Sequence, residues 1–299
     1  MTPGILEERV PLARYTTLGT GGPARWFAAP EALDELLELL AWAAAEGLPV
    51  AAVGLGSNLL VADDGFPGLA LKLKGELATV EVEGDRLLAG GGAPLAVCLH
   101  RARAAGLGGI EFACAIPGTV GGAVWMNAGA YGGDLASVLE RALVADADGA
   151  EWRTPGGLGL EYRRSALRPG QIVARAELSL RPRPVEEIKA AVAELQAQRK
   201  AAQPTNKRTF GSVFKNPEHE LSAGRMLEAC GLRGHAIGGA RISPMHANFI
   251  ENAGEARSAD AIALIAEARR RALDRFDVRL EPEVQLLGAL EIPPFPDET

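Results

Sequence analysis

The chain has 299 residues, 47% of them hydrophobic, and a formal net charge of -7. A chain of this length is too long to fold around one ordinary hydrophobic core, which predicts two or three domains with buried interiors. The acidic balance argues against a nucleic acid partner, because phosphate backbones are bound by basic surfaces. An anionic small molecule would therefore have to be bound by a local cluster of cations or backbone N–H groups.

The cysteines and the N-terminus indicate the cellular compartment, and the histidines indicate whether a metal ion is bound. The three cysteines, Cys98, Cys114 and Cys230, are widely spaced in apolar surroundings, which is typical of free thiols in a reducing compartment. The four histidines show no metal-ligand spacing, so we expect no metal ion. The first residues lack a basic segment before an apolar run, and no stretch approaches the ~20 apolar residues of a membrane span. We therefore expect a cytoplasmic protein that does not bind membranes.

The N-terminal part leads into a glycine loop. Apolar residues recur at helical spacing over 31–46, and a short buried strand is expected at 50–53. The strand runs into Gly54-Leu55-Gly56-Ser57-Asn58, but Leu59 stands where a dinucleotide-binding loop has its third glycine, so a Rossmann interpretation fails. The amides and the Ser57 hydroxyl could hold a phosphate. The alternative is a tight β-turn without a ligand.

A second glycine-rich stretch, residues 116–133, reads Ile-Pro-Gly-Thr-Val-Gly-Gly-Ala-Val-Trp-Met-Asn-Ala-Gly-Ala-Tyr-Gly-Gly. Glycine permits positive φ and close approach, so a large anion such as a diphosphate could contact the N–H groups of Gly118, Thr119, Gly121 and Gly122. The alternative is a glycine-rich turn that packs tightly on a sheet.

The middle of the chain predicts a mostly antiparallel sheet. Turn signals separate runs of strand-like residues, and one helix is expected at 94–105. The expected strands are 70–74, 79–82, 86–89, 138–145, 151–153 and 172–180. Arg181-Pro182-Arg183-Pro184 then indicates a domain boundary, because prolines so placed end a strand and stiffen a linker.

The C-terminal part predicts an α+β unit. Three helices and a final strand are expected, at 185–201, 223–230, 258–276 and 279–287. Alternation along that strand would put Glu281 and Glu283 on one face. Taken alone, this pattern is also typical of an edge strand with solvated acids.

Six motifs cover nearly the whole chain: Gly54-Leu55-Gly56-Ser57-Asn58-Leu59-Leu60, Ile116-Pro117-Gly118-Thr119-Val120-Gly121-Gly122, Asn127-Ala128-Gly129-Ala130-Tyr131-Gly132, Tyr162-Arg163, Gly211-Ser212-Val213-Phe214-Lys215-Asn216-Pro217 and Pro282-Glu283-Val284. In this order they resemble the UDP-N-acetylenolpyruvoylglucosamine reductases of peptidoglycan synthesis, the MurB family. The three tyrosines are Tyr15, Tyr131 and Tyr162, so the chain resembles the shorter, second type, which lacks an inserted loop carrying a tyrosine.

The resemblance implies an α+β fold in which an FAD-binding region of the vanillyl-alcohol-oxidase (PCMH) type precedes an α+β substrate-binding domain. The implied parts are an extension at 1–20, an FAD-binding region at 21–183 with subdomains of about 21–75 and 76–183, and a substrate-binding domain at 184–299. FAD would be bound without a covalent link. The residues implied to bind it are Gly54, Gly56, Ser57, Asn58, Leu59, Pro117, Gly118, Thr119, Gly121, Gly122, Ala128, Gly129, Ala130 and Tyr131.

The resemblance also implies a reaction, in which NADPH reduces FAD and the flavin reduces the enolpyruvyl ether of a UDP-sugar. Arg163, Ser212 and Glu283 match the family's catalytic positions. Arg163 and Glu283 would stabilise charge on the substrate carboxylate, and Ser212 would donate the final proton. Asn216 matches a position that contacts the UDP part. Candidates for binding the substrate diphosphate are Lys200, Lys207, Arg208 and Lys215.

Two other functions stay open. One is another FAD-dependent oxidase or dehydrogenase of the same fold, although neither glycine loop holds a histidine or cysteine that could attach FAD covalently. The other is a non-catalytic nucleotide-binding module, which would not explain why Arg163, Ser212 and Glu283 occur together. The expected partner is a nucleotide-sugar. The sequence does not determine the oligomeric state, and a monomer is slightly favoured.

Overall fold

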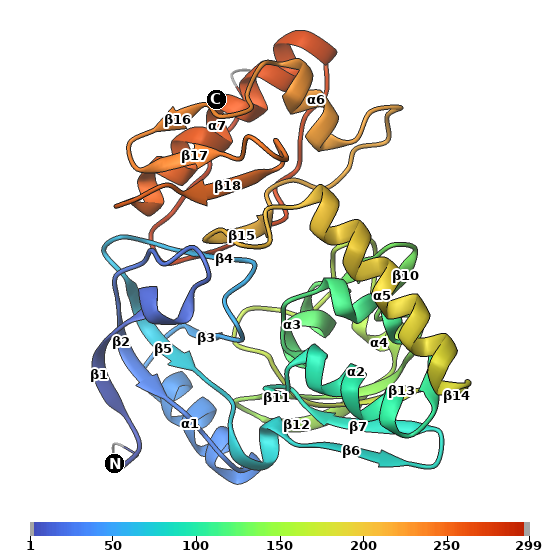
Figure 1. The fold of residues 1–299 in the computed structure, drawn as a ribbon. Helices are drawn as coiled ribbons and strands as arrows, with labels where there is room; N and C mark the ends of the chain where they lie inside the picture. The colour runs from blue at the N-terminus through green and yellow to red at the C-terminus, as the bar shows by residue number, and fades with distance from the viewer. Residues whose placement is uncertain (1–2, 296–299) are drawn as a thin grey trace. The chain divides into compact units, whose positions relative to one another are not determined.

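A computed structural model of the chain describes residues 3–295, which form two compact units (Figure 1). Unit 1 comprises the residues up to Arg9, Arg25–Leu55 and Pro67–Arg199. Unit 2 comprises Val10–Ala24, Gly56–Phe66 and the residues from Lys200 onward. Buried apolar clusters form the cores of both units.

Helices and strands are interspersed along the chain. The α-helices are α1 (Leu33–Ala45), α2 (Leu95–Ala104), α3 (Val120–Trp125), α4 (Pro155–Leu158), α5 (Val185–Ala202), α6 (Ala223–Ala229) and α7 (Ser258–Phe276). Turns of 3-10 helix cover Leu12–Tyr15, Gly75–Ala78 and Glu111–Ala115. The strands are β1 (Glu7–Pro11), β2 (Pro23–Ala28), β3 (Val50–Ala52), β4 (Leu59–Val61), β5 (Phe66–Leu71), β6 (Val80–Glu83), β7 (Arg86–Gly90), β8 (Leu107–Gly108), β9 (Gly129–Ala130), β10 (Gly133–Asp134), β11 (Leu139–Asp146), β12 (Gly149–Arg153), β13 (Ile172–Ser179), β14 (Arg181–Pro182), β15 (Thr209–Ser212), β16 (Ala236–Ile237), β17 (Ala240–Ile242), β18 (Phe249–Asn252) and β19 (Gln285–Leu287).

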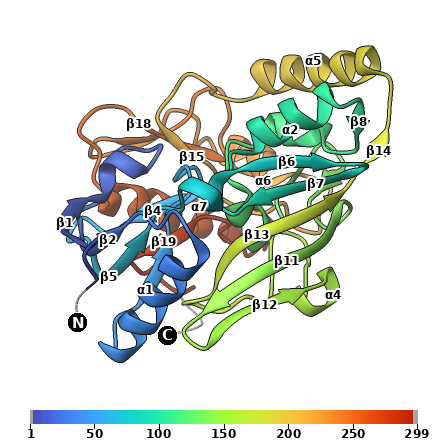
Figure 2. The same ribbon diagram turned by 90° about the horizontal axis from the view of Figure 1, so that it is seen from below.

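The five-stranded sheet of unit 1 has the order β12-β11-β13-β7-β6, and neighbouring strands run antiparallel. Figure 2 shows α2 over one face of this sheet. Both faces of β11 are buried, because Ala142 and Val144 join the core with α2 and α3, while Leu143 and Ala145 join the core with α1. A strand buried on both faces reads as a continuous apolar run, which explains why 142–145 shows no alternation.

Helix α1 packs its apolar stripe onto the sheets of unit 1. Leu36, Leu39 and Leu40 recur at helical spacing and are buried. A second sheet has the order β1-β2-β5-β3, in which β3 and β5 run parallel. Trp42 of α1 meets Trp26 of β2 edge to face, with ring centroids 5.6 Å apart.

Unit 2 is built on the antiparallel sheet β15-β18-β17-β16, and α7 lies along β16 and β17 (Figure 1). Phe210, Ile242 and Ile250 come from three strands of this sheet and pack in one core with Leu264 and Ile265 of α7. Strands β4 and β19 form a separate parallel pair in the same unit.

An aspartate from the segment 56–66 caps α7. The backbone N–H groups of Ser258 and Ala259 donate to the two carboxylate oxygens of Asp63 at 2.9 and 3.1 Å. The first N–H groups of a helix have no partner within it, and negative charge is favourable there. Asp63 thereby fixes the segment that contains Ser57 and Asn58 to α7.

The helices expected from periodicity are confirmed, and α7 has the expected bounds. Other expectations are wrong. The final strand is Gln285–Leu287 instead of 279–287, and the strand expected at 70–74 is Phe66–Leu71. The glycine-rich stretch contains the helix α3, which the sequence did not predict.

The two compact units are discontinuous in sequence. Residues 10–24 and 56–66 belong to unit 2, and α5 up to Arg199 belongs to unit 1. The boundary expected at 183/184 concerns function and stays a prediction. Within residues 3–295, no helix is long and apolar enough to cross a bilayer, and no three His, Cys, Asp or Glu side chains could together hold a metal ion.

Candidate active site

In unit 1, the first glycine loop meets the second. Thr119 is buried and begins α3 as its N-cap residue. A Cβ added to Gly54 would lie 2.7 Å from Thr119 Oγ1, so glycine is required for this contact. The amino group of Lys72 donates a hydrogen bond to the Gly54 carbonyl, and burial lowers the pKa of Lys72, with a smaller effect of Lys74.

Not every amide of the glycine-rich stretch is available to an anion, which corrects the expectation from sequence. The N–H of Gly121 donates to the carbonyl of Gly91 at 2.7 Å, and the N–H of Gly122 points to Thr119 Oγ1 at 3.5 Å. A Cβ on Gly121 would lie 3.0 Å from that same Gly91 oxygen. At Gly121, the glycine therefore serves tight packing on the sheet.

Gly118 and Gly122 differ from Gly121, because the protein itself does not require glycine there. A Cβ would meet no atom closer than 3.9 Å at Gly118 and 3.7 Å at Gly122, and neither residue has positive φ. The space that two side chains would fill is thus left beside the backbone. Such a place suits a ligand that approaches the main chain closely.

The stretch ends in a tight hairpin. Gly129 and Ala130 of β9 pair with Gly133 and Asp134 of β10, with two turn residues between them. These are Tyr131 and Gly132, both left-handed at φ 51° and 83°, as in a type I′ turn. An exposed tyrosine in this strained conformation is a feature that functional sites often retain.

Arg163 is held against this hairpin. Glu161 and Arg164 exchange two backbone hydrogen bonds, at 2.9 and 3.2 Å, which close a turn around Tyr162 and Arg163. Arg163 has φ 55°, and its Nη2 donates to the Gly129 carbonyl at 2.5 Å. The guanidinium also lies 4.9 Å from the centre of the Tyr162 ring. The structure therefore brings Arg163 together with Gly129, both of which the sequence singled out.

In unit 2, a bulge positions Ser212. Thr209 pairs with Glu251 and Ser212 pairs with Phe249, so β15 has one residue more than β18 between these pairs. Gly211 lies in the bulge with φ 85°, and a Cβ there would lie 3.2 Å from the Ser57 carbonyl oxygen. In unit 2, Ser57 therefore lies beside Gly211, the residue before Ser212, although the two motifs were predicted separately.

Beyond Ser212, the chain pairs with the segment that carries Glu283. The N–H of Glu283 donates to the Val213 carbonyl at 2.7 Å, and the N–H of Lys215 donates to the Glu281 carbonyl at 3.0 Å. Asn58 Nδ2 donates to the carbonyl of Glu283 at 3.0 Å. Unit 2 therefore holds Ser212, Glu283 and Asn58 in one hydrogen-bonded arrangement, although residues 281–283 lie outside any regular strand.

The residues expected to bind the nucleotide-sugar differ in their burial and in the contacts that they make. Lys215 is largely buried and forms an ion pair with Glu281, with 2.5 Å between Nζ and Oε1. Asn216 Oδ1 accepts the N–H of Ala223 at 3.2 Å, so its amide nitrogen is the part left to face a ligand. Lys207 and Arg208 are exposed before β15.

The sequence analysis assigned no role to two buried asparagines, Asn248 and Asn127, although Asn127 begins one of its six motifs. Asn248 accepts the N–H of Phe214 at 2.9 Å and donates to the Phe214 carbonyl at 2.8 Å, which fixes the chain two residues after Ser212. Asn127 is 3% exposed, and its Nδ2 donates to the Glu161 carbonyl, which links the glycine-rich stretch to the turn that contains Arg163. The available signal was an amide in an otherwise apolar run, as in Ala247-Asn248-Phe249.

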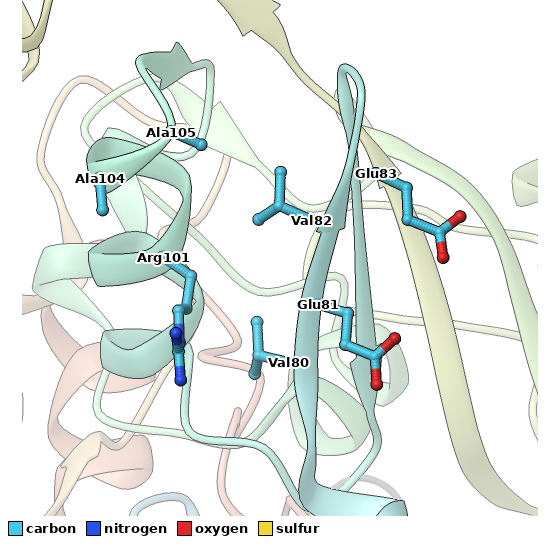
Figure 3. A pocket seen from close by; sticks show the side chains of 7 residues that line it. All are labelled: Val80, Glu81, Val82, Glu83, Arg101, Ala104 and Ala105. Carbon is cyan, nitrogen blue, oxygen red and sulfur yellow. The ribbon is translucent and has the colours of Figure 1, made fainter.

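Figure 3 shows a groove elsewhere in unit 1, between β6 and α2, with a volume of about 600 Å³. Val80, Val82 and Arg101 line it, whereas the carboxyl groups of Glu81 and Glu83 point away from α2. Convergent polar groups are typical of a small-molecule site. The groove contains none of the predicted site residues, so we do not assign the chemistry to it.

Comparison with known proteins gives the family. An FAD binding domain matches residues 24–154, and the C-terminal domain of UDP-N-acetylenolpyruvoylglucosamine reductases matches residues 203–287. The UDP-N-acetylenolpyruvoylglucosamine reductase 2 of Symbiobacterium thermophilum is 44% identical over 288 residues, covering 96% of this chain and 93% of that protein. The chain belongs to the UDP-N-acetylenolpyruvoylglucosamine reductase family.

Other members of this reductase family agree. The reductase of Anaeromyxobacter dehalogenans strain 2CP-C is 45% identical and covers 95% of this chain and 85% of its own. The crystal structure of the reductase (MurB) from Thermus caldophilus is similar with a TM-score of 0.82 and 41% identity, covering 94% of this chain and 98% of that one. The expected α+β fold, the reductase activity and FAD as cofactor are confirmed.

The reductase site in unit 1 fits FAD. The open positions beside Gly118 and Gly122 leave room for a diphosphate against the backbone, and both glycines lie within the matched FAD binding domain. Ser212 and Glu283 lie within the matched C-terminal domain, and Arg163 lies between the two matched ranges.

Proposed function

We propose that this chain reduces the enolpyruvyl ether of UDP-N-acetylglucosamine enolpyruvate to the lactyl ether of UDP-N-acetylmuramate, with NADPH as the source of hydride. The observation that carries the proposal is the pairing in unit 2 of the segments of Ser212 and Glu283, in which the Glu283 N–H donates to Val213 at 2.7 Å. A hydroxyl and a carboxyl on paired segments supply the two functions that follow hydride addition, protonation and charge stabilisation. The names of the relatives support the substrate.

The proposed catalytic residues are Arg163, Ser212 and Glu283. When bound, FAD supplies hydride to the methylene carbon of the enolpyruvyl group. The adjacent carbon then carries negative charge that spreads into the carboxylate, and a preorganised donor aimed at such charge contributes about 3–4 kcal/mol. Arg163 acts in this way, and so does Glu283 when protonated. Ser212 donates a proton to the charged carbon.

The proposed cofactor contacts come from the two glycine loops. Gly118 and Gly122 leave the backbone open to the diphosphate, and Thr119 holds the start of α3. The full proposed set is Gly54, Gly56, Ser57, Asn58, Leu59, Pro117, Gly118, Thr119, Gly121, Gly122, Ala128, Gly129, Ala130 and Tyr131. Gly121 contributes to this set by packing the loop onto the sheet and not through its N–H, because that N–H donates to the Gly91 carbonyl.

The proposed nucleotide-sugar contacts are Asn216, Lys215, Lys207 and Arg208. Asn216 offers its amide nitrogen, and the three cations offer charge to the diphosphate. The domains proposed from sequence are 21–183 for FAD and 184–299 for the substrate. The matched ranges, 24–154 and 203–287, lie inside them. We further propose a cytoplasmic monomer, which size-exclusion chromatography tests for its oligomeric state.

Anaerobic visible spectroscopy tests the function. NADPH should bleach the flavin, and the enolpyruvyl nucleotide-sugar should then restore the colour promptly as the lactyl product forms. Bleaching that the enolpyruvyl compound does not reverse would contradict the proposal.

The same experiment on Ser212→Ala tests the proton donor. Reduction by NADPH creates no carbanion, so bleaching should keep nearly its normal rate, while recovery should slow by a factor of about 100–10,000. Equal slowing of both steps would show that Ser212 shapes the flavin site and does not supply the proton.

A further inference from the structure

The turn that carries Arg163 includes a backbone conformation that costs free energy. It consists of Glu161–Arg164, called here the Arg163 turn, and its two backbone hydrogen bonds enclose a residue in left-handed conformation. For residues other than glycine, that conformation costs about 1–2 kcal/mol. A turn with this cost keeps one geometry only where its surroundings impose it.

Three hydrogen bonds fasten the Arg163 turn to residues 125–129 of the glycine-rich stretch. Asn127 Nδ2 donates to the Glu161 carbonyl at 3.0 Å, before the turn's centre. Ser165 Oγ donates to the Trp125 carbonyl at 2.7 Å, directly after the turn. The third bond is that of Arg163 itself to Gly129. The turn is thus held on both sides of the guanidinium.

Contacts within the protein account for the buried side chain of Asn127, without a ligand. Asn127 is 3% exposed, and its Oδ1 accepts the N–H of Ala136 at 2.9 Å while its Nδ2 binds Glu161. Its φ of 39° is left-handed, which asparagine tolerates better than most residues. Both polar atoms of the side chain are therefore used to join two protein segments.

We propose that Asn127 and Ser165 are positioning residues that fix Arg163 for the reduction of the enolpyruvyl group. This inference rests on the catalytic role proposed for Arg163. Neither residue supplies charge or a proton; each holds one end of the turn that aims the guanidinium. Because a displacement of about 1 Å in a catalytic group can cost a factor of about 100, loss of one fastening should be measurable in rate.

Ser165→Ala tests the proposal against Ser137→Ala as a matched control. Ser137 Oγ also donates to a backbone carbonyl, that of Asp134, at 2.6 Å, whereas this carbonyl does not belong to the Arg163 turn or to residues 125–129. In single turnover, Ser165→Ala should slow flavin reoxidation by the enolpyruvyl substrate by about 10- to 100-fold. Ser137→Ala should stay within about twofold. The flavin spectrum and bleaching by NADPH should be unchanged in both, and Ser165→Thr, which keeps a hydroxyl, should retain most of the rate.

A double-mutant cycle with Arg163→Ala decides between positioning and a general structural role. If Ser165 acts through Arg163, Ser165→Ala should cost less than about twofold once the guanidinium is gone. An undiminished cost in the Arg163→Ala background would overturn the inference while leaving the role of Arg163 intact. A wild-type rate for Arg163→Ala alone would overturn that role and the inference with it.

Asn127→Asp gives a second test at the other end of the turn. It keeps the acceptor for Ala136 but sets an oxygen against the Glu161 carbonyl, so reoxidation should slow without a change in the flavin spectrum. A normal reoxidation rate in a folded Asn127→Asp protein would count against the proposal. Should this variant fail to fold, the Ser165 cycle still decides.

Discussion

Left-handed backbone outside glycine is concentrated near the proposed chemistry. Among residues 3–295 it occurs at Arg9, Asn127, Tyr131, Arg163, Glu255 and Asp277. Three of these lie in the glycine-rich stretch or in the turn fastened to it. A strained backbone conformation is kept only where surrounding contacts hold it in place, and in this protein hydrogen bonds to residues 125–129 hold the backbone around Arg163.

Glu281 and Glu283 allow a comparison of two carboxyl groups that are two residues apart. The Glu281 side chain is 67% exposed, so water screens its ion pair with the largely buried Lys215, and a screened pair contributes about 0–1 kcal/mol. Glu281→Gln should therefore change turnover by less than about fivefold. Glu283 is fixed through its backbone to Val213 and Asn58, and its loss as a charge-stabilising donor should cost about 100-fold or more.

Steady-state turnover of Glu283→Gln and Glu281→Gln checks this difference, with melting temperatures as a control for folding. Comparable losses in the two variants would mean that the pair acts as a charged edge and that Glu283 has no particular role.

At the scale of elements, the capping of α7 by Asp63 should contribute to the stability of unit 2. Removing a helix cap typically costs about 0.5–2 kcal/mol, so Asp63→Ala should lower the free energy of unfolding by about that amount. Asp63→Asn keeps an acceptor and should cost less. Urea denaturation followed by circular dichroism measures both.

Asp64→Ala is the matched control for Asp63→Ala, because it removes the same charge from the adjacent, exposed residue. It should change the free energy of unfolding by less than about 0.5 kcal/mol. If both alanine variants lost the same stability, the effect would arise from net charge and not from the cap.

Sequence patterns predicted the long elements well, because helices such as α7 repeat apolar residues over many turns. They failed where tertiary contacts decide. Helix α3 contains two glycines, which disfavour a helix, but Val120 and Val124 bury one side of it. The expected final strand begins only after Pro282, which has no N–H for a strand ladder. The fastening of Asn127 to Glu161 joins residues too far apart in sequence for any local pattern to show.

At the scale of the whole molecule, the units are discontinuous in sequence. Leu18 and Leu60 are fully buried in the core of unit 2, although they precede its main part by more than a hundred residues. A boundary drawn once along the chain, as at 183/184, cannot show that the N-terminal segment completes a C-terminal core. The motif order nevertheless predicted the family and its cofactor correctly.

At the scale of the whole molecule, some glycines are required by the fold, whereas others leave space beside the backbone that we propose for the cofactor. Substitutions to alanine distinguish these two kinds of glycine. Gly122 lies in α3 with ordinary φ, and a Cβ there would meet no protein atom within 3.7 Å. Alanine stabilises a helix by about 1 kcal/mol relative to glycine, so Gly122→Ala should raise the melting temperature of the apoprotein. The same methyl group would occupy space proposed for FAD, and overpacking of this kind typically costs about 1–3 kcal/mol, which corresponds to about 5- to 150-fold in affinity.

The variants should therefore change apoprotein stability and FAD affinity in opposite directions. Apoprotein is prepared by acid precipitation, which should release all the flavin because the link is not covalent, and refolded protein is titrated with FAD by fluorescence quenching. Gly118→Ala should weaken FAD binding in the same way. Gly156→Ala in α4, where a Cβ would also meet no atom within 4 Å, should stabilise the fold without affecting FAD. Unchanged FAD affinity in Gly118→Ala and Gly122→Ala would mean that the cofactor does not approach the backbone at these glycines.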